Sequence, residues 1–242
     1  MKKPKRLFRL FLFYKNYMRF IIGIAFIFCF TNNSFAQQFF RVKADFSIKQ
    51  KKANGESTLI MGKVYYDKNA KKIIYINSFP KKETDVLVDT ILYSIIDNKV
   101  VSKNNTFFTY RFSIFHLALI GKLSTFGLDG SVYKLVKTEK EKDLVITTWV
   151  ADGKGKEKLG KIILSTKNKK LYGVVVFDNK NKIVMKQFFK NFVNVNGMDF
   201  PSEITQISYN ASGKESYGIT TYKNIVVDDI KDDNLYNFVL PR

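Results

Sequence analysis

The chain has few of the residues that carry chemistry in enzymes and metal sites. It contains one histidine, His116, and one cysteine, Cys29, among 242 residues. This supply is too small for an ordinary zinc site, and no serine or cysteine pattern near His116 indicates a catalytic triad. A phosphate-binding loop of the form G-x-x-x-x-G-K-[ST] is also missing. The sequence therefore gives no support for an enzyme, and we expect neither a cofactor nor a metal.

The single cysteine lies in an apolar run, FIIGIAFIFCF at residues 20–30, which follows a basic region and precedes TNNSFA. This order is typical of a secretory signal peptide. The run of eleven is too short for a transmembrane helix, which needs about 20 apolar residues. We expect residues 1–36 to be a cleaved signal peptide, although Met18 would make a more ordinary start for it. The exported chain then has no cysteine and no disulfide, which favours the periplasm of a bacterial envelope.

Acidic residues are half as frequent as basic ones, and the net charge is +20. Removing the seven positive charges of residues 1–36 leaves +13. Most of the basic residues are lysines, which are typical of a solvated surface. The alternative is attraction to anionic membrane surfaces. We do not expect nucleic acid as a partner of an exported protein.

Proline is scarce, with 4 residues, whereas phenylalanine (23) and tyrosine (13) are abundant, which favours strands over helices. Polar turns such as DKNAKK, DNK and NASGK separate short apolar runs, and no strand–helix alternation is visible. We predict a mainly β fold with few helices, built as a single large curved antiparallel sheet in one domain, residues 37–242. The predicted strands cover residues 40–49, 58–66, 72–79, 85–88, 90–96, 99–102, 133–138, 144–151, 160–166, 171–177, 183–195, 202–209 and 215–227.

One segment breaks the strand pattern. Residues 110–123, YRFSIFHLALIGKL, place Phe112, Phe115 and Leu119 at helical spacing, and apolar residues fill much of the remaining circumference. A helix of this kind is buried or covers something apolar. It is either a core helix that caps the sheet or a lid over an apolar cavity, and His116 within it is expected to be a core or cap residue.

Four aspartates, Asp228, Asp229, Asp232 and Asp233, follow the last predicted strand. They could bind calcium, but they lack the alternating ligands and the turn glycine of an EF-hand loop. We therefore expect a solvated turn here.

The order of elements resembles the outer-membrane lipoprotein carrier family, that is, LolA-like proteins with their LolB and lipoprotein-sorting relatives. The resemblance covers residues 39–242 and is carried mainly by residues 44–46, 62–66, 89–95 and 115–119. It implies a half-barrel whose concave apolar face is covered by a helical lid and takes the acyl chains of lipoproteins. It also implies delivery partners in the inner and outer membranes.

The sequence departs from this family in one turn. The carriers have an Arg-Pro pair after the aromatic strand, and their arginine helps to hold the lid. The comparable positions here are Lys68 and Asn69. A lysine cannot reproduce the forked contacts of a guanidinium group, so control of the lid through this position is in doubt.

These observations lead to one main hypothesis and two rivals. The main hypothesis is a monomeric periplasmic carrier, without catalysis, that binds acyl chains of lipoproteins or other lipids for transfer towards the outer membrane. The rivals are an envelope sensor or protein-interaction module on the same scaffold, and an enzyme with a buried carboxylate site. The expected acyl-chain-binding residues are Ile60, Val64, Tyr66, Ile74, Ile76, Leu92, Phe112, Phe115, Leu119, Trp149, Val175 and Phe177.

Strand alternation decides which of these residues share a face. In the hairpin at residues 62–80 we expect Ile74 and Ile76 to line the cavity, and Tyr75 and Phe79 to face the other way. A slip of one residue would reverse each assignment.

Overall fold

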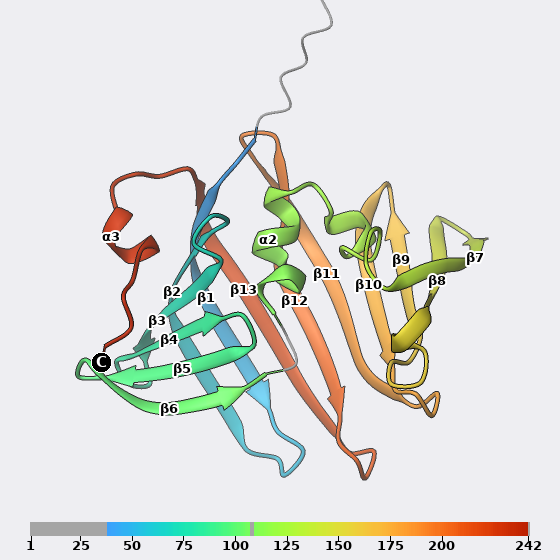
Figure 1. The fold of residues 1–242 in the computed structure, drawn as a ribbon, viewed down its shortest axis with the longest axis horizontal. Coiled ribbons are helices and arrows are strands. Elements are labelled where there is room, and N and C mark those ends of the chain that lie inside the picture. Colours follow the sequence, from blue (N-terminus) through green and yellow to red (C-terminus); the bar gives the residue numbers. More distant parts are fainter. Residues whose placement is uncertain (1–37, 107–108, 242) are drawn as a thin grey trace, which may run out of the picture. The chain divides into compact units, whose positions relative to one another are not determined.

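The strands follow two meanders that meet in the middle of one sheet. The computed structural model describes residues 38–106 and 109–241, and within these the chain forms an open, curved, antiparallel sheet of thirteen strands. The first meander runs from β1 outward to β6 at one edge, and the second runs from β7 at the other edge inward to β13, which pairs with β1 (Figure 1). The strands are β1 (Arg41–Lys51), β2 (Ser57–Asp67), β3 (Lys72–Phe79), β4 (Glu83–Val88), β5 (Ile91–Ile96), β6 (Lys99–Asn105), β7 (Tyr133–Glu141), β8 (Leu144–Ala151), β9 (Ile162–Lys167), β10 (Lys170–Phe177), β11 (Ile183–Val195), β12 (Met198–Tyr209) and β13 (Glu215–Val227).

Polar turn residues in the left-handed region of backbone conformation make the tight hairpins possible. Asp97 and Asn98, between β5 and β6, have φ values of 48° and 58°, and Asn168 and Lys169, between β9 and β10, have 50° and 64°. Two consecutive positive φ angles match the right-handed twist of the flanking strands. The prediction of a mainly β fold with one large curved antiparallel sheet is confirmed. The proposed signal peptide lies outside the described residues.

The topology explains why one face of the sheet is covered. Because β6 and β7 lie at opposite edges, the chain between them must cross from one edge to the other. It crosses the concave face, which we call the inner face, and carries η1 (Tyr110–Phe112), α2 (Ile114–Leu119) and η2 (Leu123–Thr125). Figure 1 shows α2 lying over the central strands, and α2 contacts β12 and β1. We call residues 109–130 the cover.

The prediction of one continuous helix over residues 110–123 is wrong, because the segment forms three short helical pieces. Ser113 is extended, with a ψ of 145°, and its hydroxyl oxygen accepts a hydrogen bond from the His116 backbone N–H. It therefore caps a new helix and does not continue the old one. Gly121, with a φ of 67°, follows the end of α2. The apolar spacing continues across both breaks, which is why the pattern looks like a single helix.

The opposite, outer face carries a second and smaller cluster. Tyr65, Ile74, Val86 and Ile95 are buried there against Tyr236 from α3 (Asp233–Tyr236), and Tyr65 and Tyr236 make an edge contact at 5.4 Å. The short helix α3 was not expected from the sequence. It shields the outer face of β2 to β5 near one end of these strands.

The aspartate cluster before α3 is paired with cations, which corrects the expectation of a solvated turn. Asp229 and Asp232 both pair with Lys43, and Asp233 pairs with the Arg41 guanidinium. These contacts fasten the C-terminal segment to β1. No group of three potential metal ligands occurs among the residues that the structure describes.

Candidate functional site

The inner face is built by strict alternation along neighbouring strands. On β1, Val42, Ala44 and Phe46 are buried on the inner face, and the residues between them are only half-buried. The register of β1 with β2 places Tyr66 opposite Val42 and Val64 opposite Ala44. Because neighbouring side chains on a strand point to opposite faces, this register collects the apolar side chains into one continuous surface.

Phe115 of α2 is the centre of the contact between the cover and the inner face. Its ring lies 5.8 Å from the ring of Phe200 on β12, 5.5 Å from Tyr222 on β13 and 6.4 Å from Tyr66 on β2. All four side chains are buried. A single helical side chain therefore contacts three strands, of which β2 belongs to the first meander and β12 and β13 to the second.

The second half of the cover packs on a further strand of the second meander. Phe126, which follows η2, lies 6.3 Å from Phe112 of η1 and 6.3 Å from Phe189 of β11. Leu123 and Leu128 are buried beside it. The cover thus reaches both meanders.

One hydrogen bond joins the cover to the strands within the described part of residues 109–130. The Tyr66 hydroxyl and His116 Nδ1 are 2.6 Å apart. Burial raises the pKa of the Tyr66 hydroxyl, and it lowers the pKa of His116. The positive charges of Arg111 and Lys68 lower the His116 pKa further. His116 is therefore neutral at pH 7 and can accept from, or donate to, the Tyr66 hydroxyl.

The lowered pKa of His116 predicts a pH-dependent stability. In the unfolded chain, histidine has a pKa of about 6.5, so the unfolded state binds more protons than the folded state just below that pH. The stabilising effect of the neutral form is complete above pH of about 6.5 and is lost as the pH falls towards the folded pKa. Urea unfolding at a series of pH values between neutral and mildly acidic should show this loss, and His116→Gln should flatten it. An equal slope in both proteins would contradict the assignment.

The position where the carriers have an arginine has a different role here. The Lys68 ammonium lies 4.6 Å from the centre of the Phe40 ring and makes no ion pair among the described residues. It approaches His116 closely enough to lower its pKa. The Tyr66–His116 hydrogen bond, and not an arginine, is thus the polar contact between sheet and cover.

The structure brings seven of the twelve expected binding residues together. These seven belong to, or pack against, the main cluster between the inner face and the cover: Ile60, Val64, Tyr66, Phe112, Phe115, Leu119 and Trp149. Leu92 is half-buried and pairs with Leu87, which packs against the same cluster.

Besides Leu92, four expected residues are not part of this cluster. Ile74 and Ile76 belong to the outer cluster with Tyr236, because the β2–β3 register places Ile73 opposite Tyr66 and Tyr75 opposite Val64. The expectation that Ile74 and Ile76 line the inner face is therefore wrong.

The other two lie in β10. Val175 follows the buried inner-face residue Val174, so it points to the opposite face. Phe177 is half-buried after a register shift, with the Lys161 ammonium 4.5 Å from its ring centre.

Sequence reasoning missed three residues at the centre of the site, namely Phe200, Tyr222 and Phe126. Phe200 and Tyr222 come from β12 and β13, which lie near β2 only because β13 pairs with β1. Alternation within each strand marks them as candidates, but it does not say which strands become neighbours. Phe126 lies at the end of η2 with a φ of 51°, beyond the segment 110–123 that was predicted to be helical.

No helix among the described residues is long and apolar enough to cross a membrane.

Comparison with known proteins supports the fold but not a close relative. No protein-family model matches the chain. No curated protein matches it either. Among solved structures, a LolA superfamily protein from Nitrosomonas europaea matches with a TM-score of 0.54 and 15% identity over 83% of this chain and 90% of that one.

Two further structures are similar to the same extent. A domain described as an outer membrane lipoprotein-sorting protein from Vibrio parahaemolyticus has a TM-score of 0.58 and 12% identity, and a DUF1329 family protein from Desulfovibrio piger has 0.57 and 11%. Each comparison covers 84% of this chain and 92% of the other. At these identities the similarity concerns the fold alone. The open, curved, antiparallel sheet of this chain thus has a LolA-like fold.

Proposed function

We propose that the protein is an exported, non-catalytic carrier that binds the acyl chains of lipoproteins or other lipids on its inner face. The observation that carries this proposal is the way the cover is attached. Apolar side chains such as Phe115, Leu117 and Leu128 hold it to the inner face, and one hydrogen bond from the described cover, Tyr66 to His116, reaches the strands. An acyl chain offers the same kind of contact, so it can replace the cover without breaking a polar network.

The physical need for such a carrier is large. Each CH₂ group removed from water contributes roughly 0.8 kcal/mol, so a long acyl chain crosses an aqueous compartment only when it is shielded. The cover shields the inner face of the empty protein for the same reason. Cargo and cover compete for one apolar surface, which allows loading and release.

The proposed location is the periplasm. It rests on the apolar run after a basic region at the start of the sequence, which is typical of a signal peptide. The Vibrio parahaemolyticus neighbour is described as a lipoprotein-sorting protein domain, which supports this class of cargo. Delivery partners in the inner and outer membranes are part of the same proposal.

The proposal is tested with the unit Gln38–Arg242, which contains every described strand and both hydrophobic clusters. The unit is exported to a bacterial periplasm and examined by native mass spectrometry. We expect a stoichiometric acyl ligand that a long-chain fatty-acid probe displaces.

A neighbouring pair of residues on β2 supplies a matched control. Ile60 packs against the inner cluster, whereas Leu59 lines a depression on the outer face. Ile60→Asp should weaken probe binding at least about tenfold, because an unpaired carboxylate in an apolar site is costly. Leu59→Asp adds the same charge one residue away and should leave probe binding unchanged.

A lipid-free monomer that ignores the probe would overturn the carrier. The cover would then be a permanent part of the core, and the protein-interaction module would become the better hypothesis.

A further inference from the structure

The outer face of β13, β1 and β2 exposes apolar side chains beyond the region that α3 shields. Met61 on β2 is 42% exposed, Phe79 on β3 is 47% exposed and Tyr217 on β13 is 43% exposed. A register shift between Met61 and Gly62 pairs Met61 with Phe79, so both side chains lie on this face. Where exposed apolar side chains gather and are rimmed by polar residues, the surface often marks a site of protein or membrane interaction.

Two adjoining depressions run along β1 on this face. One has a volume of about 430 Å³ and the other of about 410 Å³, and they share Lys49 and Ile219. Met61 contributes to the first and Tyr217 to the second. The exposed apolar residues and the depressions therefore form one surface.

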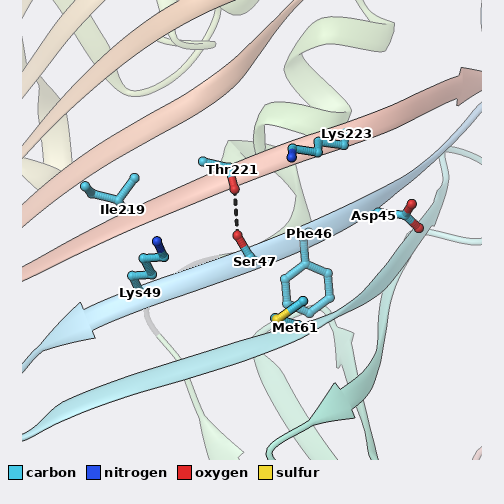
Figure 2. A pocket seen from close by; sticks show the side chains of 8 residues that line it. All are labelled: Asp45, Phe46, Ser47, Lys49, Met61, Ile219, Thr221 and Lys223. Carbon is cyan, nitrogen blue, oxygen red and sulfur yellow. Dashed lines mark hydrogen bonds between the residues drawn. The ribbon is translucent and has the colours of Figure 1, made fainter.

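The first depression has a polar centre flanked by cations. The hydroxyl groups of Ser47 and Thr221 are 2.6 Å apart, and Figure 2 shows the ammonium groups of Lys49 and Lys223 turned towards this pair. Neither lysine has an ion-pair partner in the part of the chain that the structure describes. The carboxylate of Asp45, which also lines this depression, accepts a hydrogen bond from Asn224 at 2.7 Å and lies 3.8 Å from the Lys63 ammonium.

Uncompensated cations beside hydroxyl donors favour an anion, and the exposed apolar side chains around them favour an interface with hydrocarbon. We propose that this outer surface, centred on Ser47, Lys49, Met61, Ile219, Thr221 and Lys223, docks the protein on a membrane that contains anionic phospholipids. The lysines face the phosphate groups, and Met61, Phe79 and Tyr217 enter the interfacial region. The inner face, with its cover, remains on the side away from the membrane surface.

This inference concerns the face opposite the proposed cargo site and does not depend on it. Docking keeps the carrier close to the membrane that donates or accepts an acyl chain. A protein that binds no lipid within its half-barrel could dock on a membrane in the same way. Probe binding reads the inner face and vesicle binding reads the outer face, so the two proposals fail separately.

The test measures binding of the unit Gln38–Arg242 to vesicles by flotation. The apolar run at residues 20–30 is left out because it would insert into vesicles by itself. We expect binding to vesicles that contain phosphatidylglycerol, weaker binding to phosphatidylcholine alone, and a decrease with added salt. Lys49→Gln together with Lys223→Gln should weaken partitioning about 25-fold, because each lysine near an anionic surface contributes about a factor of five.

Two lysines at the far edge of the sheet provide the matched control. Lys140 on β7 and Lys142 in the turn after it are exposed and make no ion pair among the described residues. Lys140→Gln with Lys142→Gln removes the same charge and should retain most of the binding, and Lys49→Arg with Lys223→Arg should retain it as well.

Equal losses in both Gln double variants would overturn the proposal, because binding would then follow net charge and not this surface. Equal binding to both kinds of vesicle would overturn it too. So would a concentration-dependent dimer in analytical ultracentrifugation that the Lys49/Lys223 variant abolishes, since a second copy would then cover the surface.

Discussion

Replacing Phe115 by alanine is expected to lower the free energy of unfolding by about 3–5 kcal/mol, the usual cost of removing a buried phenylalanine ring. The ring is 2% exposed and contacts Tyr66, Phe200 and Tyr222, which come from three strands. These strands are fixed by their ladders and cannot collapse into the space. Urea unfolding followed by circular dichroism measures the loss.

Phe112→Ala is the control within the same cover. Phe112 is half-buried and packs mainly against Phe126, so its loss should cost about 1–2 kcal/mol. Equal costs at the two positions would mean that the cover does not sit on the inner face through Phe115.

Asp67→Ala is expected to cost about 2–4 kcal/mol, because one carboxylate satisfies several groups at the end of β2. Asp67 is 3% exposed, and its Oδ2 accepts a hydrogen bond from Arg41 Nε at 2.5 Å. Its Oδ1 accepts from the backbone N–H groups of Asn69 and Ala70, at 2.7 and 3.0 Å. Without the carboxylate, the Arg41 guanidinium keeps, among the described residues, only Asp233 and the face of the Tyr236 ring, 5.0 Å away.

Asp178→Ala is the control that separates the contribution of the Asp67–Arg41 ion pair to stability from that of the turn hydrogen bonds. Asp178 Oδ1 also accepts from two backbone N–H groups of its own turn, those of Lys180 and Lys182, but it forms no ion pair among the described residues. Its loss should cost only about 1 kcal/mol. Thermal unfolding of both variants at low and high salt gives the comparison, and a salt-insensitive difference would argue against the Arg41 contribution.

The cation pairs of the C-terminal segment have a consequence for the position of α3. Lys43 holds Asp229 and Asp232, and Arg41 holds Asp233, so β1 organises both the sheet and the segment that shields its outer cluster. The hydrogen bond from Lys43 lowers the pKa of Asp229. This contribution to stability is present above the unfolded pKa of aspartate and is lost as the pH falls through the lower, folded value.

Where the strands lie was predictable from the sequence alone. Each of the thirteen predicted strand segments overlaps one observed strand, since turn residues such as Asp97, Asn98, Asn168 and Lys169 are local signals. The alternation of apolar residues in β1 was equally predictable from the sequence. Both signals depend on nearest neighbours in sequence, and tertiary contacts do not alter them.

Which face each residue joins was not predictable with the same certainty. The side chains of Ile74 and Tyr75 are both apolar, so alternation within β3 cannot say which one faces the cavity. The register with β2 decides which of the two faces the inner side. The outer face of β3 is apolar as well, because α3 packs against it. A one-residue bulge near Met61 then moves Phe79 to the face opposite that of Tyr75. No pattern in β3 indicates that shift.

The sequence by itself determined the strands, their turns, the apolar segment between β6 and β7 and the scarcity of catalytic residues. The tertiary structure decided that β13 pairs with β1, and this pairing puts β6 and β7 at opposite edges. The segment between them must then cross the inner face, where Phe115 contacts Phe200 and Tyr222. The pairing of the two meanders depends on contacts between residues that are far apart in the chain, and a local pattern contains no information about such partners.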